Sequence, residues 1–272
     1  MTSARRKGRS RWAGKTGPLP LAALVRRDDR DRYLTVLFAP TERREGLFAL
    51  YAFNAEIARV RERVTQPMLG QIRLQWWREV VEAAYAGMPP RAHETAAPLA
   101  AAIRQFGLSR AALDRLIDAR EMDLADAPPA DLAALETYAE GTSATLVHLA
   151  LEVLGAATPA ALAAGREIGI AYALAGLLRA LPFHARAGRS CIPQGVAVAA
   201  IGEAAAAHLA AARRSRKELP RAALPAMLPA IVAGHALARL RRAGWNPFDP
   251  LVAAPDPLLV WRLAAAMCFR RF

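Results

Sequence analysis

Residues 47–87 constrain the fold of this chain more strongly than any other stretch. Residues recur there with helical spacing on both sides of a break at Thr65-Gln66-Pro67, and Gly87 ends the pattern. The segment therefore predicts two long helices joined by a short turn. The first helix carries one stripe of residues on a single face, made of Tyr51, Asn54, Ala58, Arg61 and Glu62. What this stripe faces decides which chemistry the protein can support.

The second predicted helix has a broad apolar face, formed by Leu69, Ile72, Leu74, Trp76 and Trp77. Two adjacent tryptophans followed by Arg78 are unusual in a helix of a soluble protein. Such a group of large side chains indicates the wall of a large pocket. We therefore treat Trp76, Trp77 and Arg78 as candidate pocket residues.

The rest of the chain continues as apolar helical segments separated by proline and glycine. Thr41 and Ser109 are suitable N-cap residues, and further helices are expected near residues 94–106, 110–124, 130–154, 160–185 and 258–269. The sequence holds no alternating strand pattern, internal repeat or glycine-rich phosphate loop. It predicts an all-α protein with a single domain of roughly ten helices over residues 18–272, after a basic disordered arm at residues 1–17.

The net charge of +13 comes almost entirely from arginine, because the only lysines are Lys7, Lys15 and Lys217. Arginine is suited to bidentate binding of phosphates and carboxylates, although a high-GC genome gives the same bias without a chemical cause. No basic motif with interleaved aromatic residues accompanies this charge, so we predict no nucleic-acid partner.

The cellular compartment is constrained only loosely by the sequence. Cys191 and Cys268 lie far apart without metal-type spacing, which indicates a reducing compartment. No apolar run follows the basic N-terminus, and no uninterrupted apolar segment reaches spanning length, since the best candidate at residues 222–238 contains prolines and His235. We predict a soluble cytoplasmic protein for which peripheral membrane contact stays open.

Several ordered blocks resemble the squalene/phytoene synthase family between about residues 30 and 195. They are FALYAF at 48–53, RLQWWREVVEAAYAG at 73–87, LIDAREMDL at 116–124, the helix at 138–155, and GLLRALPFHARAGRSCIP at 176–193. The resemblance implies an isoprenoid synthase fold, in which helices surround a deep central apolar cavity. It also implies two DxxxD motifs on facing helices, whose carboxylates hold Mg²⁺ against the substrate diphosphates.

The aspartate motifs of that family are degraded in this sequence. The first falls on Ala58 and Glu62 and the second on Ala180 and His184, so one carboxylate stands where four are expected. Arginines lie in or beside the same segments, and one arginine about 6 Å from a divalent ion repels it by roughly 5 kcal/mol at an effective dielectric of about 20. We therefore expect no metal site, no cofactor and no catalytic residues.

One branch of the superfamily, the mitochondrial complex I assembly factor 6 group, resembles this chain in having the same losses. The discriminating residues are Asn54, Glu140 and His184. This resemblance implies a non-catalytic protein that assists assembly of respiratory complex I (NADH dehydrogenase), with complex I subunits or assembly intermediates as partners. It would act in the cytoplasm or at the inner membrane face, on the matrix side in a eukaryote.

The emptied metal site is a candidate anion-binding pocket for an anionic lipid or a prenyl ligand. Its candidate residues are Asn54, Arg61, Trp76, Trp77, Arg78, Arg179 and His184. The alternative function is a Mg²⁺-dependent prenyltransferase that condenses two prenyl diphosphates, for which Mg²⁺ would be the cofactor. The retained tryptophans and the loop after His184 favour that alternative.

Overall fold

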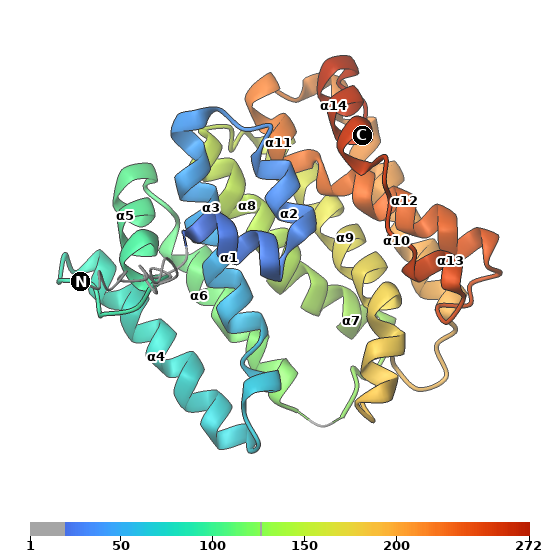
Figure 1. The fold of residues 1–272 in the computed structure, drawn as a ribbon, viewed down its shortest axis with the longest axis horizontal. Helices are drawn as coiled ribbons and strands as arrows, with labels where there is room; N and C mark the ends of the chain where they lie inside the picture. The colour runs from blue at the N-terminus through green and yellow to red at the C-terminus, as the bar shows by residue number, and fades with distance from the viewer. Residues whose placement is uncertain (1–19, 126) are drawn as a thin grey trace, which may run out of the picture.

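The computed structural model describes residues 20–125 and 127–272, and within these ranges the fold is entirely helical. Figure 1 shows the helices gathered around α3, α8 and α9. The α-helices are α1 (Leu21–Asp28), α2 (Arg30–Val36), α3 (Thr41–Ala58), α4 (Pro67–Tyr85), α5 (Ala96–Phe106), α6 (Arg110–Ala119), α7 (Leu132–Ala139), α8 (Thr145–Leu154), α9 (Pro159–Arg186), α10 (Val198–Arg214), α11 (Leu224–Met227), α12 (Pro229–Arg242), α13 (Pro250–Ala253) and α14 (Leu259–Phe269). The prediction of an all-α fold is confirmed, while the predicted arm at residues 1–17 lies outside the described residues.

The pair of helices predicted from residues 47–87 is present as α3 and α4. A 3₁₀ turn at Arg61–Arg63 lies between them, and Pro67 occupies the first turn of α4. Gly87 follows α4 with φ of +70°, a conformation that glycine adopts without steric cost. Since α3 ends at Ala58, Arg61 and Glu62 lie on the 3₁₀ turn and not on the predicted helical stripe.

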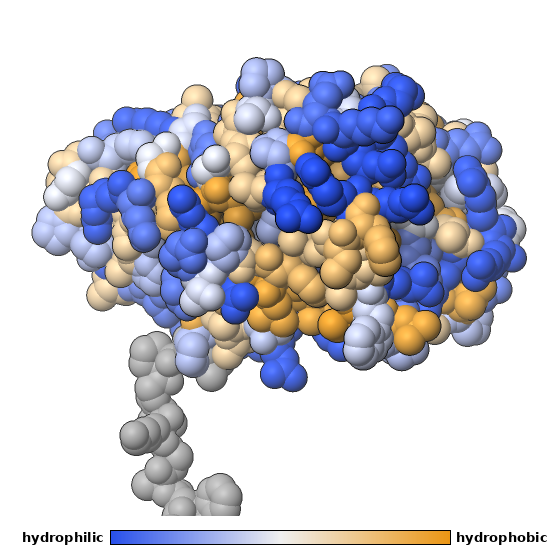
Figure 2. All heavy atoms as spheres, turned by 90° about the horizontal axis from the view of Figure 1, so that it is seen from above, coloured by the Kyte–Doolittle hydropathy of each residue, from blue (hydrophilic) through white to orange (hydrophobic). Residues whose placement is uncertain are grey.

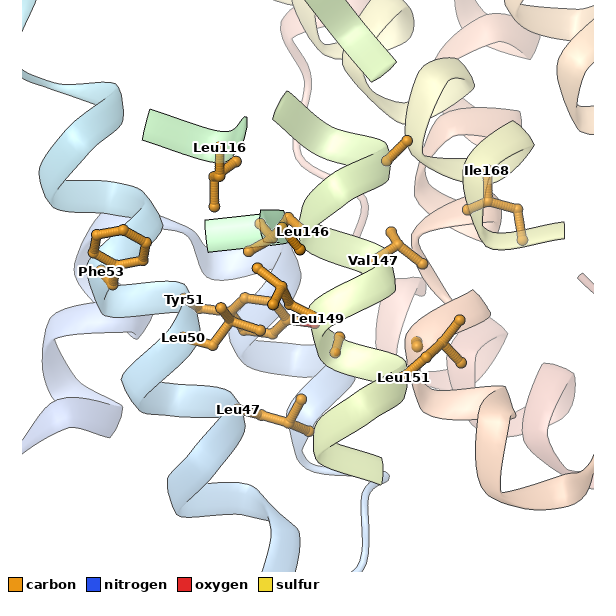
Figure 3. Close-up of a cluster of buried hydrophobic side chains, with 14 of the residues drawn as sticks. Leu47, Leu50, Tyr51, Phe53, Leu116, Leu146, Val147, Leu149, Leu151 and Ile168 are labelled. Atoms are coloured by element: carbon orange, nitrogen blue, oxygen red, sulfur yellow. The ribbon is translucent and has the colours of Figure 1, made fainter. Parts of the chain in front are cut away.

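The hydrophobic core forms where α3 packs against α5 and α8, and it extends to α9. Figure 3 shows Leu47 and Leu50 of α3 pointing toward α8, which contributes Leu146 and Leu149, while Phe53 lies farther from α8 and packs against Trp77 of α4. These side chains are almost fully buried, and each stabilises the fold by about 1.5–3 kcal/mol relative to an exposed side chain. This core holds the ends of α3 and α9 in fixed positions.

The helix predicted at residues 130–154 is present as two α-helices, α7 and α8, with a π-helical turn between them. This turn spans Glu140–Ala144. It lies directly against α9, because a Cβ atom added to Gly169 would come within 2.3 Å of the Ala144 Cα atom. The close approach of these two elements therefore requires glycine at position 169.

Two sequence-based predictions about helix ends have different outcomes. The Ser109 hydroxyl accepts a hydrogen bond from the Ala112 amide at 3.3 Å, which confirms Ser109 as the N-cap of α6. The prediction for Thr41 is wrong by one residue, because Pro40 occupies the cap position and Thr41 is already helical. Arg44 instead donates to the carbonyl oxygens of Ala39 and Leu37, each at 2.9 Å, and so stabilises the chain that enters α3.

Two helical stretches, Pro159–Arg186 and Arg221–Arg242, are long and apolar enough to cross a membrane. The sequence prediction concerned uninterrupted apolar segments, and both stretches are interrupted, the first by Arg166 and Glu167 and the second by Pro225 and Pro229. Both stretches contribute side chains to the core of the fold, and a core helix of a soluble protein passes the same test. They are weak evidence for a membrane span.

Candidate functional site

A large cavity lies where the ends of α3 and α9 meet α7, and we call it the α7 cavity. Its volume is about 920 Å³, within the range of small-molecule sites. Apolar side chains from α7 and α9 cover much of its wall. Its polar lining consists of Arg61, Glu62, Arg120, Asp123, Tyr138, His184, Arg189, Ser190 and Cys191.

A hydrogen-bonded group of Arg120, Asp123 and Tyr138 forms one wall of the α7 cavity. The Tyr138 hydroxyl donates to Asp123 Oδ1 at 2.6 Å and accepts from Arg120 Nη1 at 2.7 Å. Arg120 also lies 3.3 Å from Asp123 Oδ2 and 3.4 Å from Asn54 Oδ1. Burial raises the pKa of Tyr138, so its hydroxyl stays protonated at neutral pH. The Asp123 carboxylate is thus already engaged by two side chains.

His184 of α9 also lines the cavity, and the loop after α9 adds Arg189 and Cys191. The Nδ1 atom of His184 is buried and has no hydrogen-bond partner among the described residues. Burial lowers the pKa of His184, and the nearby Arg189 lowers it further, so the imidazole is neutral at pH 7. Arg189 reaches back to the Asp123 carbonyl oxygen at 3.5 Å, and burial raises the pKa of the Cys191 thiol.

A second cavity of about 710 Å³ lies on the other side of α9, and we call it the α12 cavity. Its charged lining consists of Asp28, Asp29, Arg30, Asp31, Arg179, Arg239 and Asp256. Here the acids are paired with cations, as in the 2.7 Å contact between Asp28 and Arg59. The hydrogen bond from Arg27 lowers the pKa of Asp28 to about 2. The charged lining of the α12 cavity is therefore held in ion pairs.

The four positions of the degraded aspartate motifs do not converge on one point. Ala58, Glu62 and His184 line the α7 cavity, whereas Ala180 lines the α12 cavity on the other face of α9. Arg179, a predicted pocket residue, also lines the α12 cavity and pairs with Asp31 at 3.1 Å. Of the predicted pocket residues, Arg61 and His184 face the α7 cavity together.

Comparison with known proteins identifies the family. The squalene/phytoene synthase family model matches residues 25–202. The chain belongs to the squalene/phytoene synthase family. Within it, the chain is 31% identical to the human protein named NADH dehydrogenase (ubiquinone) complex I, assembly factor 6, over 87% of this chain and 77% of that protein. It is 27% identical to presqualene diphosphate synthase of Rhodopseudomonas palustris, over 59% of this chain and 57% of that enzyme.

Solved structures of squalene/phytoene synthase relatives have the same fold. A dehydrosqualene synthase in complex with ligand superimposes with a TM-score of 0.78 at 15% identity, covering 92% of this chain and 95% of that one. The squalene synthase HpnC from Alicyclobacillus acidocaldarius gives a TM-score of 0.73 at 20% identity, covering 84% of this chain and 94% of that one. The prediction of an isoprenoid synthase fold is confirmed.

The donor set of this squalene/phytoene synthase relative does not fit a magnesium cluster. Glu62 and Asp123 are the carboxylates that line the α7 cavity, and Asp123 is held by Arg120 and Tyr138. Within residues 20–125 and 127–272, no group of three or more histidine, cysteine or acidic side chains is arranged to hold a metal ion. Magnesium prefers several oxygen ligands, so the residues present disfavour it.

Trp76 and Trp77, the predicted pocket wall, are not among the residues that line either cavity described above. Trp77 is buried and packs edge-on against Phe53 at 5.1 Å, while His93 packs against both indole rings at 5.3 Å. Arg78 also lies outside the cavities and pairs with acids of α6 and of the following 3₁₀ turn. In α4 the buried face turns toward α5 and α6, and Leu69 and Ile72 of the predicted apolar face are exposed.

Sequence reasoning did not single out the Arg120, Asp123 and Tyr138 group or Arg189 as cavity residues. The signal was present, because Arg120 and Asp123 lie in a block that resembles the family and Arg189 lies in the loop after His184. Two acidic residues near the degraded motifs are engaged in ion pairs instead of facing the cavity. Glu56 lies 2.6 Å from Arg63, and Glu140 lies 2.6 Å from Arg166, although Glu140 is partly exposed.

Proposed function

We propose that this protein is a non-catalytic member of the family that assists assembly of respiratory complex I. The observation that carries the proposal is the α7 cavity, which has a volume suited to a ligand but lacks a set of carboxylates for Mg²⁺. The sequence relatives support it as well. Relatives named complex I assembly factor 6 from four mammals align over 87% of this chain, whereas the two presqualene diphosphate synthases align over 59% and 60%.

The proposed partners are complex I subunits or assembly intermediates, and the proposed place of action is the cytoplasm or the inner membrane face, on the matrix side in a eukaryote. We further propose that the α7 cavity takes an anionic lipid or a prenyl ligand without a metal. Its apolar walls suit a hydrocarbon chain, and its arginines suit a phosphate. The neutral His184 can accept or donate one hydrogen bond in the same space.

Gene deletion in the source organism tests the assembly role directly. We expect less assembled complex I on native gels and a matching loss of NADH oxidation by membranes, with both restored by the wild-type gene. Normal complex I in the deletion strain would refute the proposal. This result does not depend on whether the cavity binds a ligand.

A pair of neighbouring substitutions on α7 separates the role of the cavity from the role of the whole protein. Ala134 lines the cavity, whereas Ala133 is exposed and lies outside its lining. If the cavity holds a required ligand, the gene with Ala134→Trp fails to restore complex I and the gene with Ala133→Trp succeeds. If both variants restore complex I, the assembly role does not require a ligand in the cavity, and the proposal of an assembly role itself is unaffected.

The competing function is Mg²⁺-dependent condensation of two prenyl diphosphates, favoured by the size of the cavity and by the presqualene diphosphate synthase relatives. Purified protein incubated with farnesyl or geranylgeranyl diphosphate and Mg²⁺ should release no pyrophosphate beyond the protein-free rate. The Rhodopseudomonas palustris enzyme named above is the positive control. Mg²⁺-dependent release by this protein would establish the competing function.

A further inference from the structure

The C-terminal helix α14 has a buried apolar inner face and a mostly apolar outer face. Its inner face, with Leu263 and Ala266, packs against Leu34 and Leu228 and is buried. Its outer face carries Trp261 and Phe269, which are 74% and 72% exposed. Apolar side chains of this size are normally covered by other parts of a protein, so the exposed Trp261 and Phe269 lack a covering surface in the isolated chain.

The outer face of α14 is continuous along the helix. Leu258, Trp261, Ala265 and Cys268 are exposed and follow one another at intervals of three or four residues, which places them on one stripe. Val260 and Phe269 widen this stripe and are also exposed. Arg262 is a charged residue on this side of the helix; it is exposed and pairs with Asp256 at 3.3 Å, and α14 itself holds no acidic residue. Isolated exposed apolar residues are ordinary on protein surfaces, whereas a contiguous stripe marks an interaction site.

A dense basic segment lies at the Phe269 end of this helix. Residues 213–221 contain five basic residues and one acidic residue. They are joined to the end of the chain by two hydrogen bonds, from Arg213 to the Phe272 carbonyl oxygen at 2.8 Å and from Arg270 to the Leu219 carbonyl oxygen at 2.7 Å. The exposed basic side chains here include Arg214, Lys217 and Arg271.

Figure 2 looks onto the end of the molecule where α14 and α11 lie. It shows an apolar area directly beside a dense group of hydrophilic side chains. Exposed tryptophan and phenylalanine beside arginine and lysine match the two layers of a membrane surface, namely the apolar boundary below the headgroups and the anionic headgroups themselves. We propose that the outer face of α14 and the basic segment 213–221 together dock onto an anionic lipid bilayer.

A second copy of this chain is a poorer occupant for the same surface. A two-fold interface places the same patch of both copies against each other. The basic segments would then approach one another, and like charges oppose such an interface. An anionic bilayer neutralises these side chains, and each arginine or lysine near its surface strengthens binding.

Vesicle sedimentation with the full chain tests this proposal. We expect binding to vesicles of phosphatidylcholine that contain about one third phosphatidylglycerol, weak binding to phosphatidylcholine alone, and loss of binding at high salt. The double variant Trp261→Ser, Phe269→Ser should bind the mixed vesicles at least about tenfold more weakly, because two apolar side chains no longer enter the interface. The variant Lys217→Glu, Arg271→Glu should lose about fivefold or more per residue, and only on anionic vesicles.

The matched control is Met68→Ser, Ile72→Ser, which removes exposed apolar side chains from α4 at another part of the molecule. This control should bind like the wild type, and thermal unfolding should show that all three variants fold. Equal loss in the control and in the α14 variant would overturn the proposal. Unchanged binding by the α14 variant would also overturn it. A wild-type dimer that becomes a monomer with Trp261→Ser would do the same, because the outer face of α14 would then be an interface between two copies of the chain.

Discussion

The two cavities on either side of α9 differ in how their charges are used. In the α12 cavity, Asp28 and Asp31 each pair with an arginine. In the α7 cavity, Asp123 is held by Arg120 and Tyr138, and His184 Nδ1 is left without a partner among the described residues. The α12 cavity is thus fixed by internal ion pairs, whereas the α7 cavity presents polar groups toward its own space.

This difference indicates which cavity can take a ligand. Paired charges that already satisfy one another offer little to an incoming molecule and chiefly hold helices together. Arg189 and His184 line the same cavity as the apolar side chains of α7 and α9, and this combination suits an amphipathic anion. The comparison predicts that changes around the α12 cavity alter stability, while changes in the α7 cavity alter binding.

The largest effect is expected at Arg32, which is buried beside the α12 cavity. Arg32 pairs with Asp29 at 2.6 Å, donates to the Ser143 hydroxyl at 3.2 Å, and lies 4.6 Å from the ring centroid of Tyr172. Arg32→Met should lower the free energy of unfolding by about 3–5 kcal/mol, because it leaves the Asp29 carboxylate without its cation. Urea unfolding at pH 7 measures this change.

The control for Arg32 is Arg27→Met, which removes an arginine that pairs with Asp28 but is largely exposed. It should cost no more than about 1 kcal/mol. Adding Asp29→Asn to Arg32→Met should recover part of the loss, since asparagine still caps α2 and carries no charge. Equal costs for the two arginine variants would contradict the view that burial makes the difference.

A second, smaller effect concerns α9, the helix that separates the two cavities. Gly169 touches the backbone of the π-helical turn, whereas Gly176 has open space around its Cα atom. Gly169→Ala should lower the free energy of unfolding by about 1–3 kcal/mol through overpacking. Gly176→Ala should raise it by about 0.5–1 kcal/mol, because alanine is the better helix former.

Thermal and urea unfolding of the two alanine variants should therefore move in opposite directions. The same substitution in the same helix serves as its own control, since only the surroundings of the new methyl group differ. If Gly169→Ala were neutral, the π-helical turn would be free to shift away from α9. In that case α9 would not be held in one position, and the two cavities could not be treated as having fixed shapes.

The helices were predictable because their signals are local. Apolar periodicity, the break at Pro67 and the Ser109 cap each depend on a few neighbouring residues. Local sequence did not predict which apolar side chains are buried, since Trp77 faces the core while Ile72 of the same helix faces solvent. Which apolar side chains are covered depends on the helices that pack beside them.

The motif positions show the same limit at the candidate site. Residues four apart differ by only about 40° around a helix, so Ala180 and His184 were expected on one face. In the structure they line different cavities, Ala180 the α12 cavity and His184 the α7 cavity, because different helices pack around α9 at the two positions. Pro182 lies between them within α9. Position along one helix predicts a shared side, but the neighbouring helices decide what that side faces.

The smallest effect on stability, and the one closest to ligand binding, is expected at His184. Its pKa lies below the ordinary value of 6.5 in the folded protein, so the unfolded chain binds the proton more readily. The free energy of unfolding should therefore fall as the pH drops below about 6.5, and His184→Gln should remove that part of the pH dependence. At pH 8 the same variant should differ from the wild type by no more than about 0.5 kcal/mol.

Histidine resonances followed by NMR separate the two cavities. Burial also lowers the pKa of His235 in the α12 cavity, where Asp256 lies 3.0 Å away. Pyrophosphate that enters the α7 cavity should raise the pKa of His184 and leave that of His235 unchanged, because a nearby anion favours the protonated imidazole. A shift confined to His235 would place the anion among the ion pairs of the α12 cavity, and the assignment of roles to the two cavities would be reversed.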